Sequence, residues 1–166
     1  LERLSRIHEH VHRNGKALTV YLSMGFGNPY GDDWSPDLLV DWAGKIIEQY
    51  APRVVALSDT IGKANSTTIA GSFSALIPAH PETSFGAHLH ATPWDALEKI
   101  KAAHNAGCLR FDGALRGVGG CPMAQDELVG NIPTERMIEY FMESDLWSVL
   151  DHRAYAQAQS IAADLF

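Results

Sequence analysis

The sequence has few cysteines, no long apolar run and no excess of positive charge, and each of these shortages excludes a class of protein. Only two cysteines, Cys108 and Cys121, occur in 166 residues, so we expect no disulfide framework and a reducing setting, either cytoplasmic or an organelle matrix if eukaryotic. No apolar run approaches the ~20 residues of a membrane span, and the first residues lack the form of a signal peptide. The net charge is −7 and no basic patch stands out. We therefore expect neither nucleic acid nor a membrane as a partner.

Short apolar runs alternate with helical apolar stripes along the chain, which is typical of an α/β protein with a parallel sheet. We predict strands at residues 17–22, 54–57, 85–90 and 109–113. We predict helices at residues 1–12, from Ser35-Pro36 onward, at 66–77, at 93–105, from about 134, and around 155–165.

Two details of the helices depend on proline. Pro78 and Pro81 are expected in the loop after helix 66–77, and Thr92 is the expected N-cap of helix 93–105, with Pro93 at its first position. No linker or repeat interrupts the chain, so residues 1–166 are predicted to form a single domain. Four strand–helix units and a helical tail make either half of an eight-fold barrel or a small open sheet, and the alternation alone fits both.

Polar side chains follow the ends of the predicted strands. His88 and His90 are two residues apart, so a strand would present both imidazoles on one face as a pair of metal ligands. Asp59 follows the preceding strand, and the carboxyl ends of parallel strands meet at one edge of a sheet. The alternatives are two histidines satisfied by hydrogen bonds within the fold, and an aspartate that caps the next helix.

A glycine-rich loop at residues 116–122 carries Cys121, and Gly130-Asn131 follows it. Glycines permit such a loop to move, so a thiol in it is able to donate a proton when the loop closes over a substrate. The alternative is an ordinary exposed thiol. Cys108 precedes an apolar strand and is expected to pack in the core, whereas Asp112 and Arg116 either line the site or form a structural pair.

Four segments together resemble the hydroxymethylglutaryl-CoA lyase family. The segments are residues 24–31 (MGFGNPYG), 57–62 (LSDTIG), 86–90 (GAHLH), and 119–124 (GGCPMA) with Gly130-Asn131. The His-x-His pattern is shared with the related homocitrate and isopropylmalate synthases, whereas Gly-Gly-Cys-Pro favours the lyase. The resemblance covers essentially the whole chain but only the C-terminal half of the family's domain.

The resemblance implies a (β/α)8 TIM-barrel fold, of which this chain supplies roughly the last four βα units and a C-terminal helical tail. It implies a divalent cation, Mg²⁺ or Mn²⁺, bound by His88, His90 and Asn131, with Cys121 and Asp59 as catalytic residues. The arginine–aspartate pair of the family's first strand has no counterpart here, and Ala91 stands where many relatives have aspartate.

The implied activity is a metal-dependent carbon–carbon lyase that cleaves 3-hydroxy-3-methylglutaryl-CoA to acetoacetate and acetyl-CoA, a reaction of leucine degradation and ketone-body formation. One alternative is a Claisen-type synthase that joins acetyl-CoA to a 2-oxo acid, and another is a non-catalytic half-barrel or a fragment of the enzyme. Half a barrel leaves strand edges unpaired, so we expect a homo-oligomer or an association with the missing N-terminal half. An acyl-CoA is the expected substrate.

Overall fold

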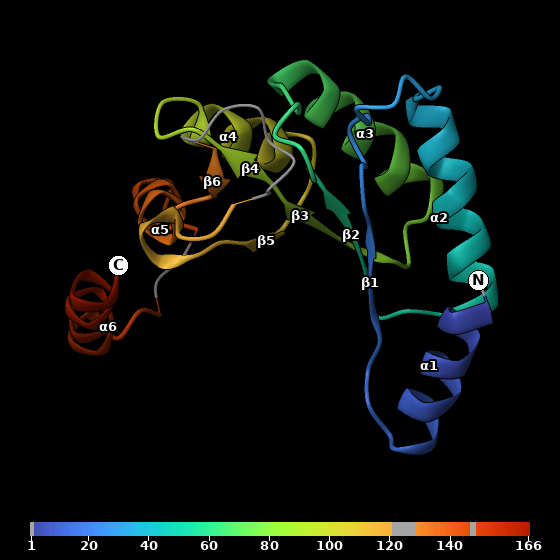
Figure 1. The fold of residues 1–166 in the computed structure, drawn as a ribbon, viewed down its shortest axis with the longest axis horizontal. Coiled ribbons are helices and arrows are strands. Elements are labelled where there is room, and N and C mark those ends of the chain that lie inside the picture. Colours follow the sequence, from blue (N-terminus) through green and yellow to red (C-terminus); the bar gives the residue numbers. More distant parts are fainter. Residues whose placement is uncertain (1, 121–128, 147–148) are drawn as a thin grey trace.

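Four parallel strands form the sheet that carries the fold (Figure 1). The computed structural model describes residues 2–120, 129–146 and 149–166. The strands lie in the order β1-β2-β3-β5, with every neighbouring pair parallel. Their bounds are β1 Thr19–Leu22, β2 Val54–Ser58, β3 Ser84–His88 and β5 Arg110–Asp112. The parallel α/β architecture predicted from the alternation is therefore confirmed.

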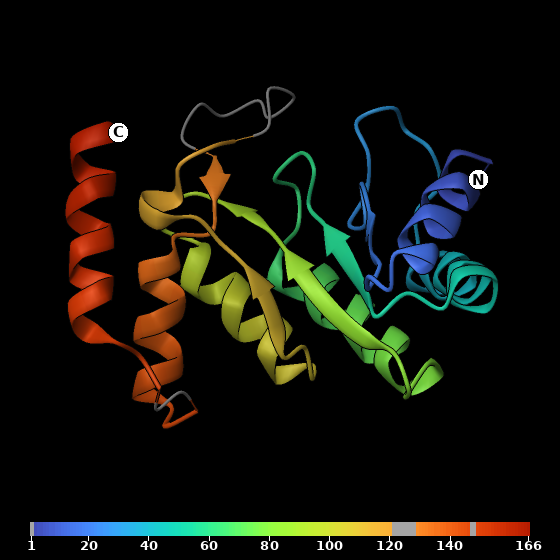
Figure 2. The same cartoon turned by 90° about the horizontal axis from the view of Figure 1, so that it is seen from below.

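Three helices follow the first three strands and pack side by side against one face of the sheet (Figure 2). Their bounds are α2 Pro36–Tyr50, α3 Ser66–Ala79 and α4 Ala96–Asn105. Alternate strand residues such as Val55, Leu57 and Phe85 face these helices and are buried with Ile69 and Phe73 of α3 in the main apolar core. The core on the helix side fixes which strand residues turn to the opposite, concave face, where the polar groups gather.

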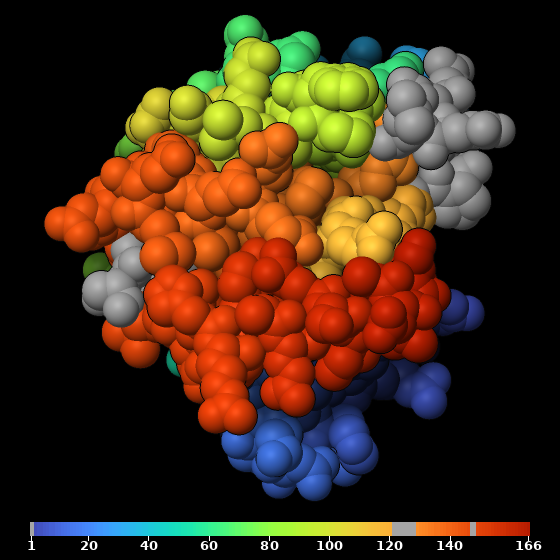
Figure 3. Space-filling view, turned by 90° about the vertical axis from the view of Figure 1, so that its left-hand side faces the viewer, coloured from blue at the N-terminus to red at the C-terminus, as the bar shows by residue number. Residues whose placement is uncertain are grey.

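The remaining elements lie outside the four-stranded sheet. Helix α1 (Glu2–Arg13) precedes β1, whereas a two-stranded antiparallel pair, β4 (His90–Ala91) and β6 (Gly130–Asn131), lies beyond β3. A short 3-10 helix, η1 (Leu115–Gly117), leads from β5 toward the end of the chain. Helices α5 (Thr134–Glu143) and α6 (His152–Leu165) cover the face seen in Figure 3, next to η1. No helix in the described part of the chain is long and apolar enough to cross a membrane.

Local sequence signals explain most helix ends. The Ser35 side chain accepts a hydrogen bond from the Leu38 backbone N–H at 3.1 Å, so α2 begins at Pro36 as predicted. Asn65 caps α3 through a reciprocal bond with Thr68. Pro78, however, lies inside α3, because a proline in the last turn removes only its own hydrogen bond and His80 N–H still bonds to Leu76.

The predicted start of helix 93–105 is wrong. Helix α4 begins at Ala96, and Asp95 occupies the N-cap position. The backbone N–H and the hydroxyl of Thr92 both donate to Oδ1 of Asp95, at 2.7 and 2.8 Å. These two bonds close a turn through Pro93 and Trp94, so the chain completes this turn before it becomes helical.

Candidate functional site

The histidine pair lies where the main sheet passes into the small antiparallel pair. The single strand predicted at 85–90 is divided, because β3 ends at His88 and β4 begins at His90. Leu89 between them is buried in the core, and the alternation of side chains survives the break. The two imidazole rings lie with their centroids 5.4 Å apart and their planes perpendicular. The prediction that both rings share one side of the sheet edge therefore holds, although the strand is interrupted.

A backbone oxygen orients the His90 ring. Its Nδ1 atom lies 2.5 Å from the carbonyl oxygen of Asp59. A carbonyl oxygen only accepts hydrogen bonds, so Nδ1 carries the ring proton, and in the neutral ring the lone pair is on Nε2. This arrangement is typical of metal-binding histidines, whose second nitrogen donates to a carbonyl or carboxylate group.

A carboxylate lies behind the His88 ring on the concave face. Oδ2 of Asp112 is 3.5 Å from His88 Nδ1 and accepts a hydrogen bond of 2.6 Å from the Tyr21 hydroxyl. Nη1 of Arg110 lies 3.2 Å from the other oxygen, Oδ1. Donation to this carboxylate, with some burial, raises the pKa of the Tyr21 hydroxyl above its usual value. Asp112 therefore lines the site and pairs with Arg110, so the proposed pairing with Arg116 is not the one that the structure contains.

The register of the sheet brings Tyr21 and Arg110 to this network. Tyr21, Ala56, Gly86 and Arg110 are successive cross-strand partners, one step below the layer of His88 and Asp112. The two central residues are small, so the long outer side chains reach across them. A Cβ atom on Gly86 would lie only 2.9 Å from Arg110 Nη1. Tyr21 and Arg110 were not predicted as site residues, because only the register shows that they share a face with His88.

Asn131 stands directly across from His90 in the β4–β6 pair. Its Nδ2 donates to the carbonyl oxygens of Val118 and Gly119, at 2.9 and 3.3 Å. These bonds leave the amide oxygen Oδ1 as the group available to a cation. The structure thus brings together His88, His90 and Asn131, the three ligands that the resemblance implies.

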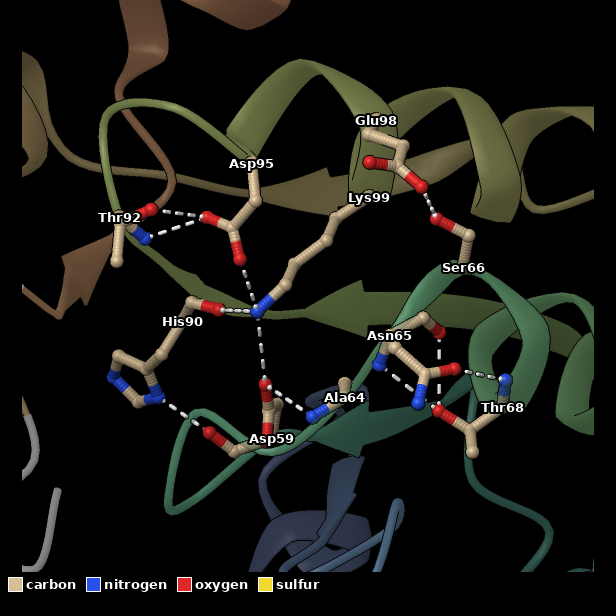
Figure 4. Close-up of polar contacts among 10 residues, drawn as sticks. All are labelled: Asp59, Ala64, Asn65, Ser66, Thr68, His90, Thr92, Asp95, Glu98 and Lys99. Carbon is tan, nitrogen blue, oxygen red and sulfur yellow. Dashed lines mark hydrogen bonds and ion pairs between the residues drawn. The ribbon is translucent and has the colours of Figure 1, made fainter. Parts of the chain in front are cut away.

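Asp59 is buried, with 1% of its surface exposed, and its two polar groups face different partners. In Figure 4 its carboxylate points toward Lys99 and its carbonyl oxygen toward the His90 ring. The carboxylate accepts a hydrogen bond from Ala64 N–H at 3.1 Å, and Asn65 rather than Asp59 caps α3. Burial raises the pKa of the Asp59 carboxyl, and the nearby Lys99 opposes this shift. A catalytic role for Asp59 stays a prediction.

Lys99 is a buried charge that sequence analysis did not single out. It lies on the buried face of α4 together with Ala96, Ile100 and Ala103, and only 4% of its surface is exposed. The sequence does contain a signal: Lys99 is three residues after Ala96 and next to Ile100, on the apolar stripe of the predicted helix, where an apolar residue normally stands.

Two other residues singled out from the sequence have different fates. Cys121 lies outside the described residues. Arg116 has a backbone φ of 61°, and its N–H donates to the Glu135 carboxylate.

The donor set fits part of the coordination shell of a divalent cation. Among the described residues no group of three histidine, cysteine, aspartate or glutamate side chains is placed to hold a metal ion. Two imidazole nitrogens and one amide oxygen are available instead, as the preceding contacts show. An octahedral Mg²⁺ or Mn²⁺ ion needs further oxygen ligands, which water, substrate or a carboxylate from another part of a barrel would supply.

The family match and the curated relatives of this chain agree with each other. The HMGL-like family model matches residues 3–161. A (R)-citramalyl-CoA lyase of Chloroflexus aurantiacus is 31% identical over 141 residues, which are 85% of this chain and 44% of that protein. A 3-hydroxy-3-isohexenylglutaryl-CoA/hydroxymethylglutaryl-CoA lyase of Pseudomonas aeruginosa is 29% identical over 166 residues, 99% of this chain and 55% of that protein. The chain spans about half the length of the curated relatives it matches.

The solved structures agree with these matches. The HMG-CoA lyase of Brucella melitensis superposes with a TM-score of 0.84 at 27% identity, and the match covers 99% of this chain and 57% of that one. The hydroxymethylglutaryl-CoA lyase of Pseudomonas aeruginosa gives a TM-score of 0.85 at 28% identity, with 99% and 54% covered.

Proposed function

Because the chain belongs to the HMGL-like family, we propose that it forms the metal-binding part of a carbon–carbon lyase that acts on an acyl-CoA. Its parallel sheet and its structural relatives identify the fold as part of a TIM barrel, as predicted from the sequence. The proposed reaction is the cleavage of 3-hydroxy-3-methylglutaryl-CoA to acetoacetate and acetyl-CoA, and the family's link to leucine degradation and ketone-body formation would then apply.

One observation carries this proposal: the three donor side chains at the sheet edge are already oriented. His90 Nδ1 is bound to the Asp59 carbonyl, and His88 Nδ1 faces the Asp112 carboxylate. The Asn131 nitrogen is bound to two carbonyl oxygens. Each contact occupies the atom that a cation would not use, so Nε2, Nε2 and Oδ1 are the remaining donors.

The reaction requires a base for the substrate hydroxyl and an acid for the released carbon. Loss of the hydroxyl proton breaks the C2–C3 bond, which gives the ketone acetoacetate and the enolate of acetyl-CoA, and the enolate then takes up one proton. When bound, Mg²⁺ or Mn²⁺ would polarise the substrate hydroxyl and carboxylate oxygens. The family resemblance supports Cys121 as the acid. The contacts of Asp59 favour a role in positioning the site, since its carbonyl oxygen orients His90 and its carboxylate is paired with Lys99.

The proposed partners are an acyl-CoA substrate and a second half-barrel. β1 and β5 are the two edge strands of the four-stranded sheet. A closed barrel requires both edges to be paired, either by an N-terminal half of the same enzyme or by a second copy of this chain. The names of the relatives above give (R)-citramalyl-CoA, 3-hydroxy-3-isohexenylglutaryl-CoA and hydroxymethylglutaryl-CoA as substrates, so the acyl group is the variable part of the proposal.

Metal binding is tested first, by calorimetry with Mn²⁺ on the chain and on two variants. We expect His88→Ala and His90→Ala to weaken binding, whereas the control His10→Ala, on the exposed face of α1, leaves it unchanged. Equal Mn²⁺ affinity in all four proteins would remove the metal site from the proposal.

Catalysis is tested by acetoacetate release from 3-hydroxy-3-methylglutaryl-CoA in the presence of Mn²⁺. We expect no turnover by the chain alone, because a barrel site is assembled from the ends of many strands and the parallel sheet in the described part of the chain has four. Turnover is expected when the N-terminal half-barrel is added in trans. Robust turnover by the isolated chain would contradict this expectation and mean that a half-barrel, paired with itself, suffices. Cleavage of citramalyl-CoA instead would change the assigned acyl group and keep the lyase class.

A further inference from the structure

The ammonium group of Lys99 meets three oxygen acceptors from three separate segments (Figure 4). Its Nζ atom donates to the backbone oxygen of His90 at 2.8 Å and lies 3.2 Å from Oδ2 of Asp95. The third acceptor is Oδ2 of Asp59, at 3.7 Å. The first two acceptors lie within hydrogen-bond distance of the ammonium group, whereas the contact with Asp59 is a longer ion pair.

Lys99, His90 and Asp59 form a closed circuit of contacts. Lys99 binds the His90 backbone, His90 binds the Asp59 backbone through its ring, and the Asp59 carboxylate faces Lys99 again. The circuit fixes both ends of His90, its carbonyl group and its imidazole. With the backbone and the ring nitrogen both fixed, the direction of Nε2 is fixed as well.

Burying the charges of Lys99 and Asp59 costs desolvation free energy, so stability alone does not explain the pair. Lys99 is 4% exposed and Asp59 is 1% exposed, and a buried ion pair often contributes no more to stability than apolar residues of similar volume. An apolar residue would satisfy the packing of α4, whose neighbouring buried positions are alanine and isoleucine. Only a group with several N–H donors is able to bind a backbone oxygen and two carboxylates at once.

We propose that Lys99 is a positioning residue for the metal ligand His90, which it orients by binding the His90 carbonyl oxygen and the Asp59 carboxylate at once. The proposal rests on the proposed function, because it takes His90 as a ligand. Lys99 is buried and binds the backbone of His90 rather than its ring, so its proposed role is to orient the ligand and not to act on the substrate.

The first test reads the His90 ring in the metal-free chain by ¹⁵N–¹H NMR. A ring N–H that donates to a carbonyl exchanges slowly with water, and the spectrum of a His90→Gln variant assigns its signal. We expect a protected Nδ1 proton in the unaltered chain and in the control Lys101→Met, an exposed lysine of the same helix. In Lys99→Met we expect the signal to broaden or disappear through faster exchange.

The second test separates positioning from stability. Lys99→Met leaves the buried Asp59 carboxylate without its cation, whereas Lys99→Met with Asp59→Asn removes both charges. We expect the double variant to recover much of the lost stability but to keep a Mn²⁺ affinity at least about tenfold below that of the unaltered chain, the usual effect of losing an outer-shell partner.

The outcomes distinguish the role of Lys99 from the proposed function. A protected Nδ1 proton in Lys99→Met, or full Mn²⁺ affinity in the double variant, would overturn the role of Lys99. A third outcome is that the unaltered chain does not bind Mn²⁺, while the His90 Nδ1 proton exchanges faster in Lys99→Met. This result would count against the proposed function and support the orienting contact.

Discussion

The two histidines of the site are supported in different ways, although they are only two residues apart. The His88 side chain is 33% exposed and faces a carboxylate network on the open concave face. His90 is 8% exposed; its ring contacts the backbone oxygen of Asp59, and its own backbone oxygen binds the buried Lys99 of α4. Water and salt screen an exposed network, whereas buried charges depend on each other. A change behind His90 should therefore disturb the fold, and a change behind His88 should disturb mainly the direction of the ligand.

The largest effect is expected for Lys99→Met, which breaks the buried support of His90. Removal of one partner of a buried ion pair costs roughly 3–5 kcal/mol, because the remaining charge is uncompensated. Here Asp59 would be that charge. Urea unfolding followed by circular dichroism measures the loss, and Lys101→Met, exposed on the same helix, should change it little. A loss below about 1 kcal/mol would mean that the two sides of the site do not differ in this way.

A smaller effect is expected for Asp112→Asn, which weakens the exposed support of His88. Asp112 is 23% exposed, so we expect the free energy of unfolding to change by no more than about 1 kcal/mol. Mn²⁺ affinity should fall by about tenfold, since the carboxylate behind a ligand histidine is lost. Urea unfolding measures the free energy of unfolding, and titration calorimetry at two salt concentrations measures the Mn²⁺ affinity. The exposed Asp41→Asn is the control for both. A loss of several kcal/mol would show that the Asp112 network contributes as much to stability as the buried pair of Lys99 and Asp59.

A still smaller effect is expected for Gly86→Ala. The new Cβ would lie 2.9 Å from Arg110 Nη1, the far end of a flexible side chain, so the guanidinium is expected to move away from Asp112. We expect the free energy of unfolding to change by less than about 1 kcal/mol and Mn²⁺ affinity by less than about threefold. Gly71→Ala in α3, where the added Cβ meets open space, serves as a control and should stabilise the chain by roughly 0.5–1 kcal/mol. Destabilisation by several kcal/mol in Gly86→Ala would contradict the expectation that the Arg110 guanidinium moves to make room for the new Cβ.

The smallest effect on stability at neutral pH is expected from ionisation of Cys108, a buried thiol. Burial raises the pKa of its thiol from 9.0 to about 12, so the folded state keeps the thiol neutral. Above pH 9 the unfolded chain ionises first, and stability attributable to this group falls between about pH 9 and 12. In a Cys121→Ser background, a thiol reagent should label Cys108 only after unfolding. Rapid labelling of the folded chain at pH 8 would show that this side of the sheet is open.

Local patterns explain why much of the fold was predictable. The apolar alternation identified the strands, and the Ser35-Pro36 signal gave the start of α2, since both depend on residues that are close in sequence. The family was predicted from short motifs and is confirmed by the match over residues 3–161. The predicted start of α4 at Pro93 was wrong, because the Asp95 side chain accepts hydrogen bonds from Thr92 and pairs with Lys99. These contacts hold residues 92–95 in a turn, and the helix begins only at Ala96.

The sequence by itself determined that His88 and His90 project to the same side, because side chains alternate along extended backbone whatever surrounds them. Only the tertiary structure decided what stands behind each ring. Asp59 is 31 residues from His90 in the chain, and Tyr21 is 91 residues from Asp112, so no local pattern predicts these contacts. The parallel register brings them together, and burial then decides that the Asp59 carboxylate turns toward Lys99 while its carbonyl oxygen orients the ligand.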